Sequence, residues 1–380
     1  MLTSRERVIK TINFEKPDRV PLDLNPLLDC YINLKKYLKL DIEETIKHNF
    51  AMEVIPHTKV LKRLNIDIIS VKLGSPKSKK KDIRTDGLVK DEWGTLYKMI
   101  SQPGGGNYYE VMHSPLKNAT IDDLKNYPWP QPDLPGRGEG AETTAKRLFE
   151  DTDLAILGRF GGPITETALY MLGMENWMIR LAKDPEFIFA LLEKITDIQI
   201  ALDRIGLEAT AKYLQIYKAS GEDLGMQTGP LYSPTMFKNQ LLPHLKRRFT
   251  AAKDYLKQVN PSVKLMLHSC GSIRRFIPDL IDAGVDIIDP VQPHAAGMDT
   301  KELKKDFGDR VTFHGGIDIQ EVLPFGSREE IEEEVVKRVS TLGRGGGYIL
   351  APAHNVQADV PPENLEILYQ AAVRYGSYSL

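Results

Sequence analysis

The chain repeats one pattern along its length, a short apolar run followed by a stretch whose apolar residues recur at helical spacing. The apolar runs predict eight strands, at residues 19–24, 66–72, 154–160, 213–219, 264–270, 285–291, 311–317 and 348–353. The clearest helical stretches are 184–205, 234–259, 272–283 and 328–342. Apolar strands that alternate with helices are typical of a parallel sheet covered by helices, and eight such units favour closure into a barrel. We therefore predict an α/β protein in which residues 1–380 form a single (β/α)8 TIM barrel.

Residues 73–153, between the second and third predicted strands, are too long for a single crossover. We expect an insertion here that caps the barrel or forms a lid. It includes a predicted hairpin around 93–97 and the triglycine 104–106. It also holds a lysine cluster that we interpret as a solvated loop rather than a docking patch for a protein partner: Lys77, Lys79, Lys80 and Lys81.

A second glycine-rich run, at 343–347, follows a predicted helix and precedes a predicted strand. Phosphate-binding loops run in the other direction, from strand into helix. We therefore interpret these glycines as a left-handed end to the helix at 328–342.

Composition and charge exclude several classes of protein. With 42% apolar and 27% charged residues, the chain is typical of a globular protein. Its net charge of -2 gives no electrostatic footprint for nucleic acid or anionic lipid. No run of about 18 apolar residues occurs, and the polar start at 1–7 does not resemble a signal peptide, so we expect a cytoplasmic protein that does not enter the membrane.

The run at 264–270 ends in an imidazole and a thiol two residues apart, His268 and Cys270. Side chains at positions i and i+2 of a strand point to one face, so both can reach one ion. The run at 348–353 ends in the same way at His354. Three such groups at neighbouring strand ends suit a catalytic zinc with one open position, and we predict them as ligands of Zn²⁺. The other cysteine, Cys30, is interpreted as a packed small residue.

Polar residues also follow the other predicted strands, and barrels of this type take their catalytic groups from the C-terminal strand ends. We predict Glu222, Asp223 and Asp289 as catalytic residues that act as proton donors, anchors for the histidines or a fourth metal ligand. Each of these carboxylates could instead cap a helix or stabilise a turn. Three further residues are predicted to bind substrate: Arg159, Tyr170 and His314.

Six short motifs are spread over nearly the whole chain. They are Phe-Glu-Lys-Pro-Asp-Arg-Val-Pro at 14–21, Ala-Thr-Ile-Asp-Asp-Leu at 119–124, Tyr-Pro-Trp-Pro at 127–130, Asp-Leu-Gly-Met-Gln at 223–227, His-Ser-Cys-Gly at 268–271 and Pro-Pro-Glu-Asn at 361–364. Together they resemble the uroporphyrinogen decarboxylase superfamily, and within it most closely the zinc-containing, corrinoid-dependent methyltransferase branch. The resemblance implies a (β/α)8 barrel, in agreement with the strand pattern, and leaves the reaction open.

The methyltransferase branch typically carries His-x-Cys at the fifth strand and a second cysteine at the eighth, all binding zinc. His268 and Cys270 match this pattern, whereas Ala353-His354-Asn355 stands where the second cysteine would fall. Imidazole is also an acceptable zinc ligand. The decarboxylase branch neutralises substrate carboxylates with an arginine-rich N-terminal segment, and residues 20–27 contain no arginine. His354 does resemble a histidine that decarboxylases carry near the end of the last strand.

We predict a methyltransferase that moves a methyl group between a small methylated substrate, or a thiol acceptor, and the cobalt of a separate corrinoid protein. Zinc would polarise the methylated heteroatom or activate the thiol. Nothing in the chain resembles a corrinoid-binding module, so this cofactor is expected on a partner protein, and the resemblance implies that a homodimer is common. The alternatives are a cofactor-independent decarboxylase of a porphyrinogen-like polycarboxylate and a family member that binds a small molecule without turnover.

Overall fold

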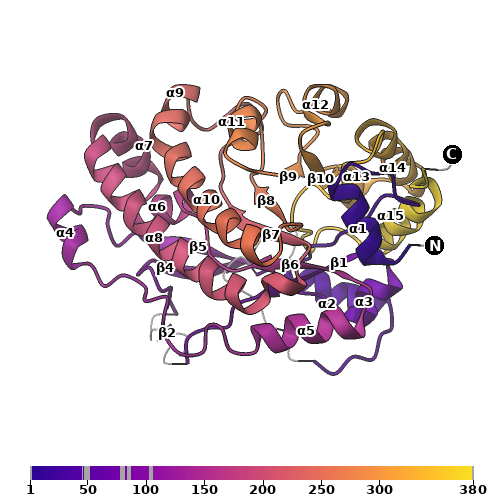
Figure 1. The fold of residues 1–380 in the computed structure, drawn as a ribbon, viewed down its shortest axis with the longest axis horizontal. Coiled ribbons are helices and arrows are strands. Elements are labelled where there is room, and N and C mark those ends of the chain that lie inside the picture. The colour runs from indigo at the N-terminus through magenta and orange to yellow at the C-terminus, as the bar shows by residue number, and fades with distance from the viewer. Residues whose placement is uncertain are drawn as a thin grey trace.

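The computed structural model describes residues 2–44, 46, 52–77, 82–83, 87–101 and 106–378. Seven parallel strands form one curled sheet with helices on its outside (Figure 1). Their order in the sheet follows the chain: β1 (Ile68–Lys72), β6 (Ala155–Arg159), β7 (Ile216–Gly221), β8 (Lys264–His268), β9 (Ile287–Val291), β10 (Thr312–Ile317) and β11 (Tyr348–Pro352). Each overlaps a predicted apolar run, so these strand predictions are confirmed.

The remaining predicted strand, 19–24, lies between β11 and β1 but does not form a regular strand. Leu22 makes an isolated bridge to Leu350, and the Leu350 N–H donates to the Pro21 carbonyl. On the other side, the Asp67 N–H donates to the Leu22 carbonyl. Pro21 has no N–H, so a continuous hydrogen-bond ladder cannot form here. The segment still fills the eighth position, which gives the predicted TIM-barrel-like α/β fold.

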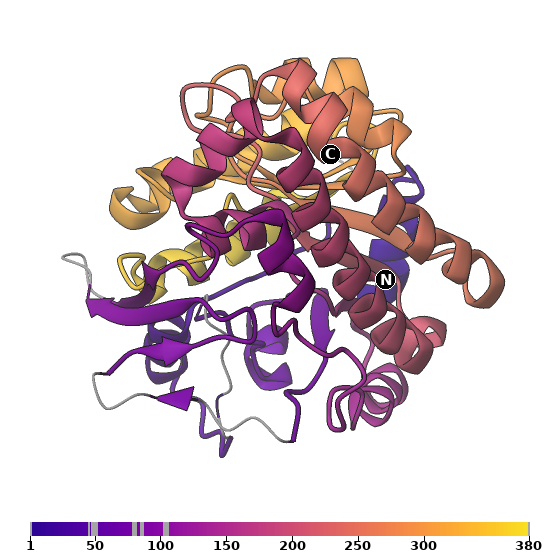
Figure 2. The ribbon, with the colours of Figure 1, turned by 90° about the vertical axis from the view of Figure 1, so that its left-hand side faces the viewer.

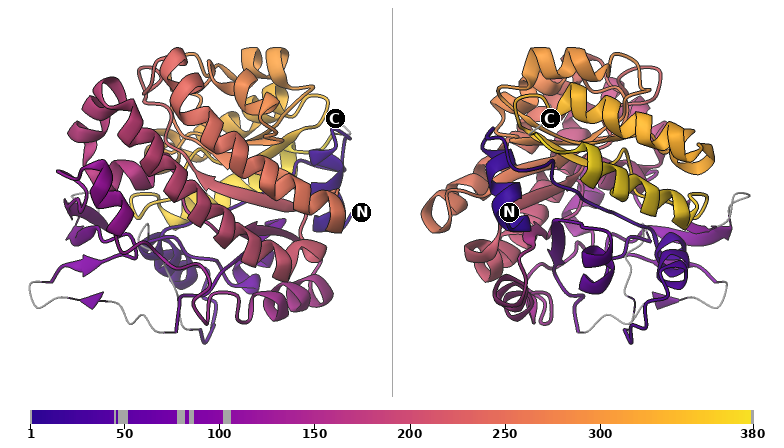
Figure 3. Two further views of the ribbon diagram at one scale, coloured as in Figure 1. Left: turned by 60° about the vertical axis from the view of Figure 1, so that its left-hand side comes forward. Right: turned by 90° about the vertical axis from the view of Figure 1, so that its right-hand side faces the viewer.

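Helices connect the strands and cover the sheet (Figures 1 and 3). The structure contains α1 (Ser4–Ile12), α2 (Leu28–Tyr37), α3 (Thr58–Arg63), α4 (Ile121–Asn126), α5 (Ala141–Asp151), α6 (Thr165–Leu172), α7 (Met174–Lys183), α8 (Pro185–Thr210), α9 (Pro234–Met236), α10 (Leu242–Val259), α11 (Ile277–Asp282), α12 (Thr300–Phe307), α13 (Val322–Phe325), α14 (Arg328–Leu342) and α15 (Pro362–Tyr375). Within the described ranges, no helix combines the length and apolar character needed to cross a membrane.

Local sequence explains where the predicted helices begin and end. α14 has the predicted bounds, because Ser327 and Glu330 form a capping box at its start. The predicted helix 234–259 is interrupted by a π-helical turn at Phe237–Leu241. Pro243 lacks the N–H that would continue the α-helical pattern there. The predicted helix 272–283 is shorter than expected, because α11 begins only at Ile277, beside Pro278.

The glycine run after α14 adopts the predicted left-handed geometry. Gly345, Gly346 and Gly347 have φ angles of 84°, 90° and 67°. The Gly346 N–H donates to the Gly343 carbonyl, which closes the turn between α14 and β11. The interpretation of this run as a helix end rather than a phosphate loop is therefore confirmed.

The inward side chains of the barrel form an apolar layer with a polar layer above it. The apolar layer packs against Val8 and Ile12 of α1, and consists of Ile68, Ala155, Leu157, Ile216, Met266, Ile287 and Ile349. α1 thus closes the N-terminal end of the barrel (Figure 3, right). Because side chains alternate along a strand, the next inward positions lie two residues further on. On four of the strands these positions are polar: Arg159, Lys218, His268 and Asp289.

The insertion forms a small antiparallel sheet beside the barrel (Figure 2). Its strands are β2 (Asp82–Ile83), β3 (Val89–Lys90), β4 (Leu96–Ser101) and β5 (Asn107–His113). The predicted hairpin is confirmed, because β3 pairs with β4 across a turn that contains Gly94 at φ 86°. At the other end of the sheet, the Asn107 N–H donates to Asp29 of α2 over 3.1 Å. Lys79, Lys80, Lys81 and Gly104 with Gly105 lie outside the described residues.

Asp67 joins three parts of the chain at the seam of the barrel. Its buried carboxylate lies 2.6 Å from Arg7 Nη1 of α1 and 2.7 Å from Arg19 Nη1. It also accepts the Leu22 N–H over 2.8 Å. The N-terminal helix and the irregular eighth segment are therefore both fixed to the residue that precedes β1.

Replacing Asp67 with Asn should destabilise the fold strongly. The amide would remove the carboxylate that pairs with Arg19 and would leave Arg7 with Asp18 as its anionic partner, and breaking a buried ion pair costs about 3 kcal/mol or more. Urea unfolding should show this loss. The matched control is Arg204→Gln, which removes an exposed pair with Glu208 and should cost below about 1 kcal/mol. Equal losses in the two variants would contradict the role of Asp67.

Candidate active site

A cavity of about 440 Å³ opens at the C-terminal ends of the strands. Barrels of this architecture place their active sites at this end. The cavity is lined by Glu53, Val54, Ile55, Lys72, Leu73, Arg159, Phe160, Gly161, Gly162, Pro163, Glu166, Lys218, Ser220, Gly221, Asp223, His268, His354 and Asn355. Of the predicted site residues, the structure therefore brings Arg159, Asp223, His268 and His354 to the lining of one cavity.

Asp289 lies beneath this cavity, and its carboxylate contacts three basic side chains. Its Oδ2 lies 2.6 Å from Lys218 Nζ and 2.9 Å from His268 Nδ1, and its Oδ1 lies 2.7 Å from His314 Nδ1. Burial alone would raise the pKa of Asp289, but Lys218, His314 and His268 together hold it well below its usual range. Asp289 is thus an ionised anchor for His268, a role that the sequence analysis had considered for it.

His314 lies one layer below the cavity, between two carboxylates. Its Nε2 is 3.0 Å from Asp23 Oδ2, and its Nδ1 faces Asp289. Burial lowers the pKa of His314, but Asp289 and Asp23 outweigh it and raise the pKa to about 9. This histidine is a buried cation that supports Asp289, and the structure does not place it on the cavity wall where a substrate-binding residue would lie.

His268 and His354 both line the cavity, with ring centroids 5.5 Å apart and planes at 67°. Because Asp289 engages Nδ1 of His268, the other nitrogen, Nε2, is left for a metal or a substrate. Burial and the neighbouring His268 lower the pKa of His354 to about 4, so this ring is neutral at pH 7. Both imidazoles are therefore suited to act as metal ligands.

Cys270 is half-buried behind the cavity wall, and its thiol donates to Asp223 Oδ1 over 3.4 Å. Burial, followed by the carboxylate of Asp223, raises the pKa of this thiol far above its usual value. The thiol is therefore protonated, and a bound cation would be needed to make it a thiolate at neutral pH.

The three residues are of the donor types that zinc prefers, and the two histidines also have a fitting separation. Two imidazoles on one tetrahedral zinc have ring centroids about 5 Å apart, close to the observed separation of His268 and His354. Within the described parts of the chain, no three histidine, cysteine, aspartate or glutamate side chains already stand close enough to hold a metal ion. Metal binding would therefore draw Cys270 towards the two rings.

Glu166, from the start of α6, lines the cavity. The sequence places it among the polar residues at the C-terminal mouth of the barrel without indicating a specific role. Its carboxylate accepts a hydrogen bond from the hydroxyl of Tyr170. Burial and then the nearby charge of Asp223 raise the pKa of Glu166 to about 7. Tyr170 therefore positions a lining residue, and its ring meets Tyr97 of β4 edge to face at 6.4 Å. Through this contact the inserted sheet touches the site.

Arg159 lines the cavity but is already paired. Its Nη2 lies 2.7 Å from Glu53 Oε2, and Asn355 Nδ2 donates to the other oxygen of Glu53 over 3.2 Å. Glu53 and Lys218 were missed by the sequence analysis. Lys218 offered a signal, a single lysine inside the apolar run of β7, whereas Glu53 comes from a segment outside the predicted strands and offered none.

Glu222 points away from the cavity, unlike its neighbour Asp223. Its fully buried carboxylate accepts the N–H groups of Ile164 and Thr165 over 2.7 and 2.8 Å, and also the Thr165 hydroxyl. These contacts cap the N-terminus of α6. Among the predicted catalytic residues, Glu222 is thus the one that the structure keeps apart from the others.

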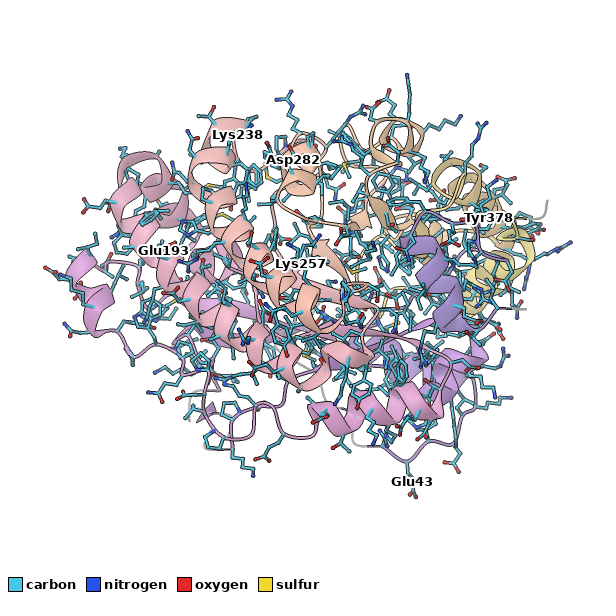
Figure 4. The ribbon with its side chains drawn as sticks, in the orientation of Figure 1. Glu43, Glu193, Lys238, Lys257, Asp282 and Tyr378 are labelled. Carbon is cyan, nitrogen blue, oxygen red and sulfur yellow. The ribbon has the colours of Figure 1, made fainter. Side chains whose placement is uncertain are left out.

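A buried network fixes the loop between β6 and α6, which carries Gly161 and Gly162. Arg248 of α10 forms an ion pair with Asp203 of α8 at 2.6 Å and donates to the Gly162 carbonyl. Asp203 accepts the Gly161 N–H, and a Cβ at Gly161 would lie only 2.5 Å from Arg248 Nη2. Figures 1 and 4 show α8 and α10 side by side, with Glu193 labelled on α8.

Comparison with known proteins identifies relatives of this chain. A protein named uroporphyrinogen decarboxylase 2, chloroplastic, from Arabidopsis thaliana is 26% identical over 272 residues, which cover 70% of this chain and 63% of that protein. The uroporphyrinogen decarboxylase of Pseudoalteromonas atlantica is 24% identical over 285 residues, covering 72% and 75% respectively. The match thus spans less than two thirds of the Arabidopsis protein.

Among solved structures, a methyltransferase from Methanosarcina mazei superposes with a TM-score of 0.66 over 99% of both chains. The sequences are 17% identical in that alignment, so this likeness concerns the fold. A model of the family described as Uroporphyrinogen decarboxylase (URO-D) matches residues 101–375 of this chain. Because that match covers well over half of the sequence, the protein belongs to the uroporphyrinogen decarboxylase (URO-D) family.

Proposed function

We propose that the protein is a zinc-dependent methyltransferase that moves a methyl group between a small methylated substrate, or a thiol acceptor, and the cobalt of a corrinoid carried by a separate protein. The observation that supports this choice is the way in which charged side chains of the cavity are paired. Arg159 is paired with Glu53 and Lys218 with Asp289. Glu166 and Asp223 have no cationic side chain within ion-pair distance among the described residues. A substrate with many carboxylates would meet these two carboxylates without free guanidinium partners.

His268, Cys270 and His354 would hold the zinc, with Asp289 fixing the ring of His268 from behind. Bound there, the metal would supply Lewis-acid activation of a heteroatom or of a thiol. Glu166 lines the same cavity, and its carboxyl could hold or release the proton that the substrate heteroatom gains or loses. The corrinoid protein would approach the cavity mouth, because α1 closes the other end of the barrel.

Cofactor-independent decarboxylation of a porphyrinogen-like polycarboxylate is the second candidate. The curated relatives described above carry the decarboxylase name, at 26% and 24% identity. His354 in the cavity also resembles the histidine of that branch. The experiments below separate the two reactions.

Purified protein should contain about one zinc per chain, and Cys270→Ser should reduce this content strongly because it removes the only predicted thiolate ligand. Elemental analysis after dialysis measures the content. Cys30→Ala is the control, since Cys30 is buried in the core and should leave zinc binding intact. Metal-free wild-type protein, or equal loss in both variants, would contradict the proposed site.

Methyl transfer can be tested with free cobalamin in place of the corrinoid protein. With a panel of small O-, N- and S-methyl compounds, cob(I)alamin should be converted to methylcobalamin, or methylcobalamin should lose its methyl group to a thiol. The visible spectrum reports either change. Asp289→Asn should slow the reaction by about 10- to 100-fold, because His268 loses its anchor. Release of carbon dioxide from a porphyrinogen by metal-free protein would instead support decarboxylation.

The shifted pKa of Glu166 predicts a pH-dependent stability. A carboxyl whose folded pKa is raised from 4.5 to about 7 binds more protons when folded, so it destabilises the fold progressively as the pH rises between these values. Metal-free Glu166→Gln should therefore gain stability relative to the wild type between pH 5 and 8, by at most about 3 kcal/mol. Urea unfolding at both pH values measures the difference. A constant difference between the two proteins would contradict the raised pKa.

A further inference from the structure

Arg159 and Lys218 are neighbouring cations in the lining of the cavity. The register of β6 and β7 pairs Arg159 with Lys218, and both residues line the cavity. Adjacent strands of a sheet lie about 4.8 Å apart. Like charges side by side on neighbouring strands are unfavourable unless other groups compensate for them. We call these two residues the donor pair.

Each member of the donor pair is held by one carboxylate. Arg159 Nη2 lies 2.7 Å from Glu53 Oε2, and Lys218 Nζ lies 2.6 Å from Asp289 Oδ2. Burial lowers the pKa of Arg159, but the charges of Glu53 and then Asp289 outweigh it and raise the pKa. The carboxylate of Asp289 therefore acts on both cations, so a single ligand in the cavity can be within reach of both.

Most hydrogen-bond donors of the donor pair have no acceptor in the described parts of the protein. A guanidinium group carries five N–H donors and an ammonium group carries three. Where the structure describes the chain, the Arg159 side chain forms one hydrogen bond, to Glu53, and that of Lys218 forms one, to Asp289. The side chain of Lys218 is only 9% exposed. Buried donors that lack an acceptor are costly, so a ligand that supplies acceptors here gains their hydrogen bonds.

Buried arginines elsewhere in the protein are satisfied differently. Arg7, Arg248 and Arg338 each use all three guanidinium nitrogens in hydrogen bonds within the protein. None of these three arginines lines the cavity, whereas Arg159 does. The contrast indicates that the remaining donors of Arg159 serve a ligand of the cavity.

A carboxylate is the group that fits the donor pair best. Its two oxygens match the parallel N–H groups of a guanidinium, and an ammonium can donate to the same oxygens. Glu166 and Asp223 belong to the same lining and would repel any further anionic group. The cavity, at about 440 Å³, also has the size of a small-molecule site. The site therefore suits a small molecule with one carboxylate rather than several.

We infer that the substrate is a small methylated carboxylic acid and that the donor pair binds its single carboxylate. The methylated part of this inference rests on the proposed function, whereas binding of the carboxylate needs neither zinc nor a corrinoid. A carboxylate held at one end would fix the place of the methyl group relative to His268 and His354. Arg159 thereby keeps the substrate-binding role that the sequence predicted, and Lys218 gains one.

Isothermal titration calorimetry tests this inference with three acids, each compared with its own amide: methoxyacetate, 3-methoxypropanoate and (methylthio)acetate. Each acid should bind at least about tenfold more tightly than its amide, because hydrogen bonds to a charged acceptor are stronger. Arg159→Gln and Lys218→Gln should each abolish most of this preference. Glu166→Gln is the matched control, since it removes a charge of the opposite sign from the same lining and should preserve or increase the preference.

Arg159→Lys is a milder variant that keeps a cation beside Glu53. It should stay folded by circular dichroism, yet weaken acid binding several-fold without changing amide binding, because the fork of N–H groups is lost. Wild-type protein that binds none of the three acids, or that binds acids and amides equally, would overturn the inference. So would an undiminished acid preference in both glutamine variants.

Two further outcomes separate this inference from the proposed function. Tighter binding of propane-1,2,3-tricarboxylate than of all three acids would overturn the single-carboxylate assignment and favour the decarboxylase. Protein that prefers the acids, but contains no zinc and transfers no methyl group, would retain the donor pair as a carboxylate site while the proposed function fails. Zinc-containing protein that transfers methyl groups without any acid preference would have the opposite meaning.

Discussion

The site depends on one buried carboxylate, that of Asp289 in the middle of β9. It contacts Lys218 of β7, His268 of β8 and His314 of β10, so a single side chain links four neighbouring strands. Burying a carboxylate is costly unless cations and hydrogen bonds compensate for lost water, and here each oxygen has such partners. The same contacts fix the ring orientation of His268. Stability of the polar layer and orientation of the candidate metal ligand therefore have a common origin.

Much of the fold could be predicted from sequence, because strand and helix periods differ and alternate regularly along the chain. The errors have local causes. Pro21 prevents the first predicted strand from forming a ladder, and Pro243 introduces a π-turn into a helix that hydrophobic spacing alone made continuous. Periodicity reports which side of an element is apolar. It does not show where a proline removes a backbone N–H and so interrupts the hydrogen-bond pattern. These two departures can be predicted only from the positions of the individual prolines.

The site could be predicted only in part. Parallel strands in a barrel bring their C-terminal ends together, so His268, Asp223 and His354 could be expected near one another. Glu222 and Asp223 looked equivalent in sequence, yet adjacent residues face opposite ways, and only Asp223 reaches the cavity. Glu53 could not be found, because it belongs to no predicted strand and reaches the cavity only through the tertiary fold.

The motifs that indicated the family also have a physical meaning in the structure. The segments at 223–227 and 268–271 are the two loops whose backbones pack together, and their glycines are the residues at which a side chain would collide. The two sequence motifs therefore correspond to the segments that form this close backbone contact. The constraint acts on the backbone of these two loops, and it does not extend to position 354, where this chain has a histidine in place of the second cysteine of the methyltransferase branch.

The closure of one barrel end by α1 bears on the timing of any reaction with a protein partner. With Val8 and Ile12 packed into the apolar layer, small molecules and a docking protein must share the same entrance. A small reactant would have to enter before its macromolecular partner covers the mouth, and the product would be trapped until that partner departs. If a corrinoid protein docks there as proposed, turnover would follow a compulsory order, and dissociation of the complex would be required in every cycle.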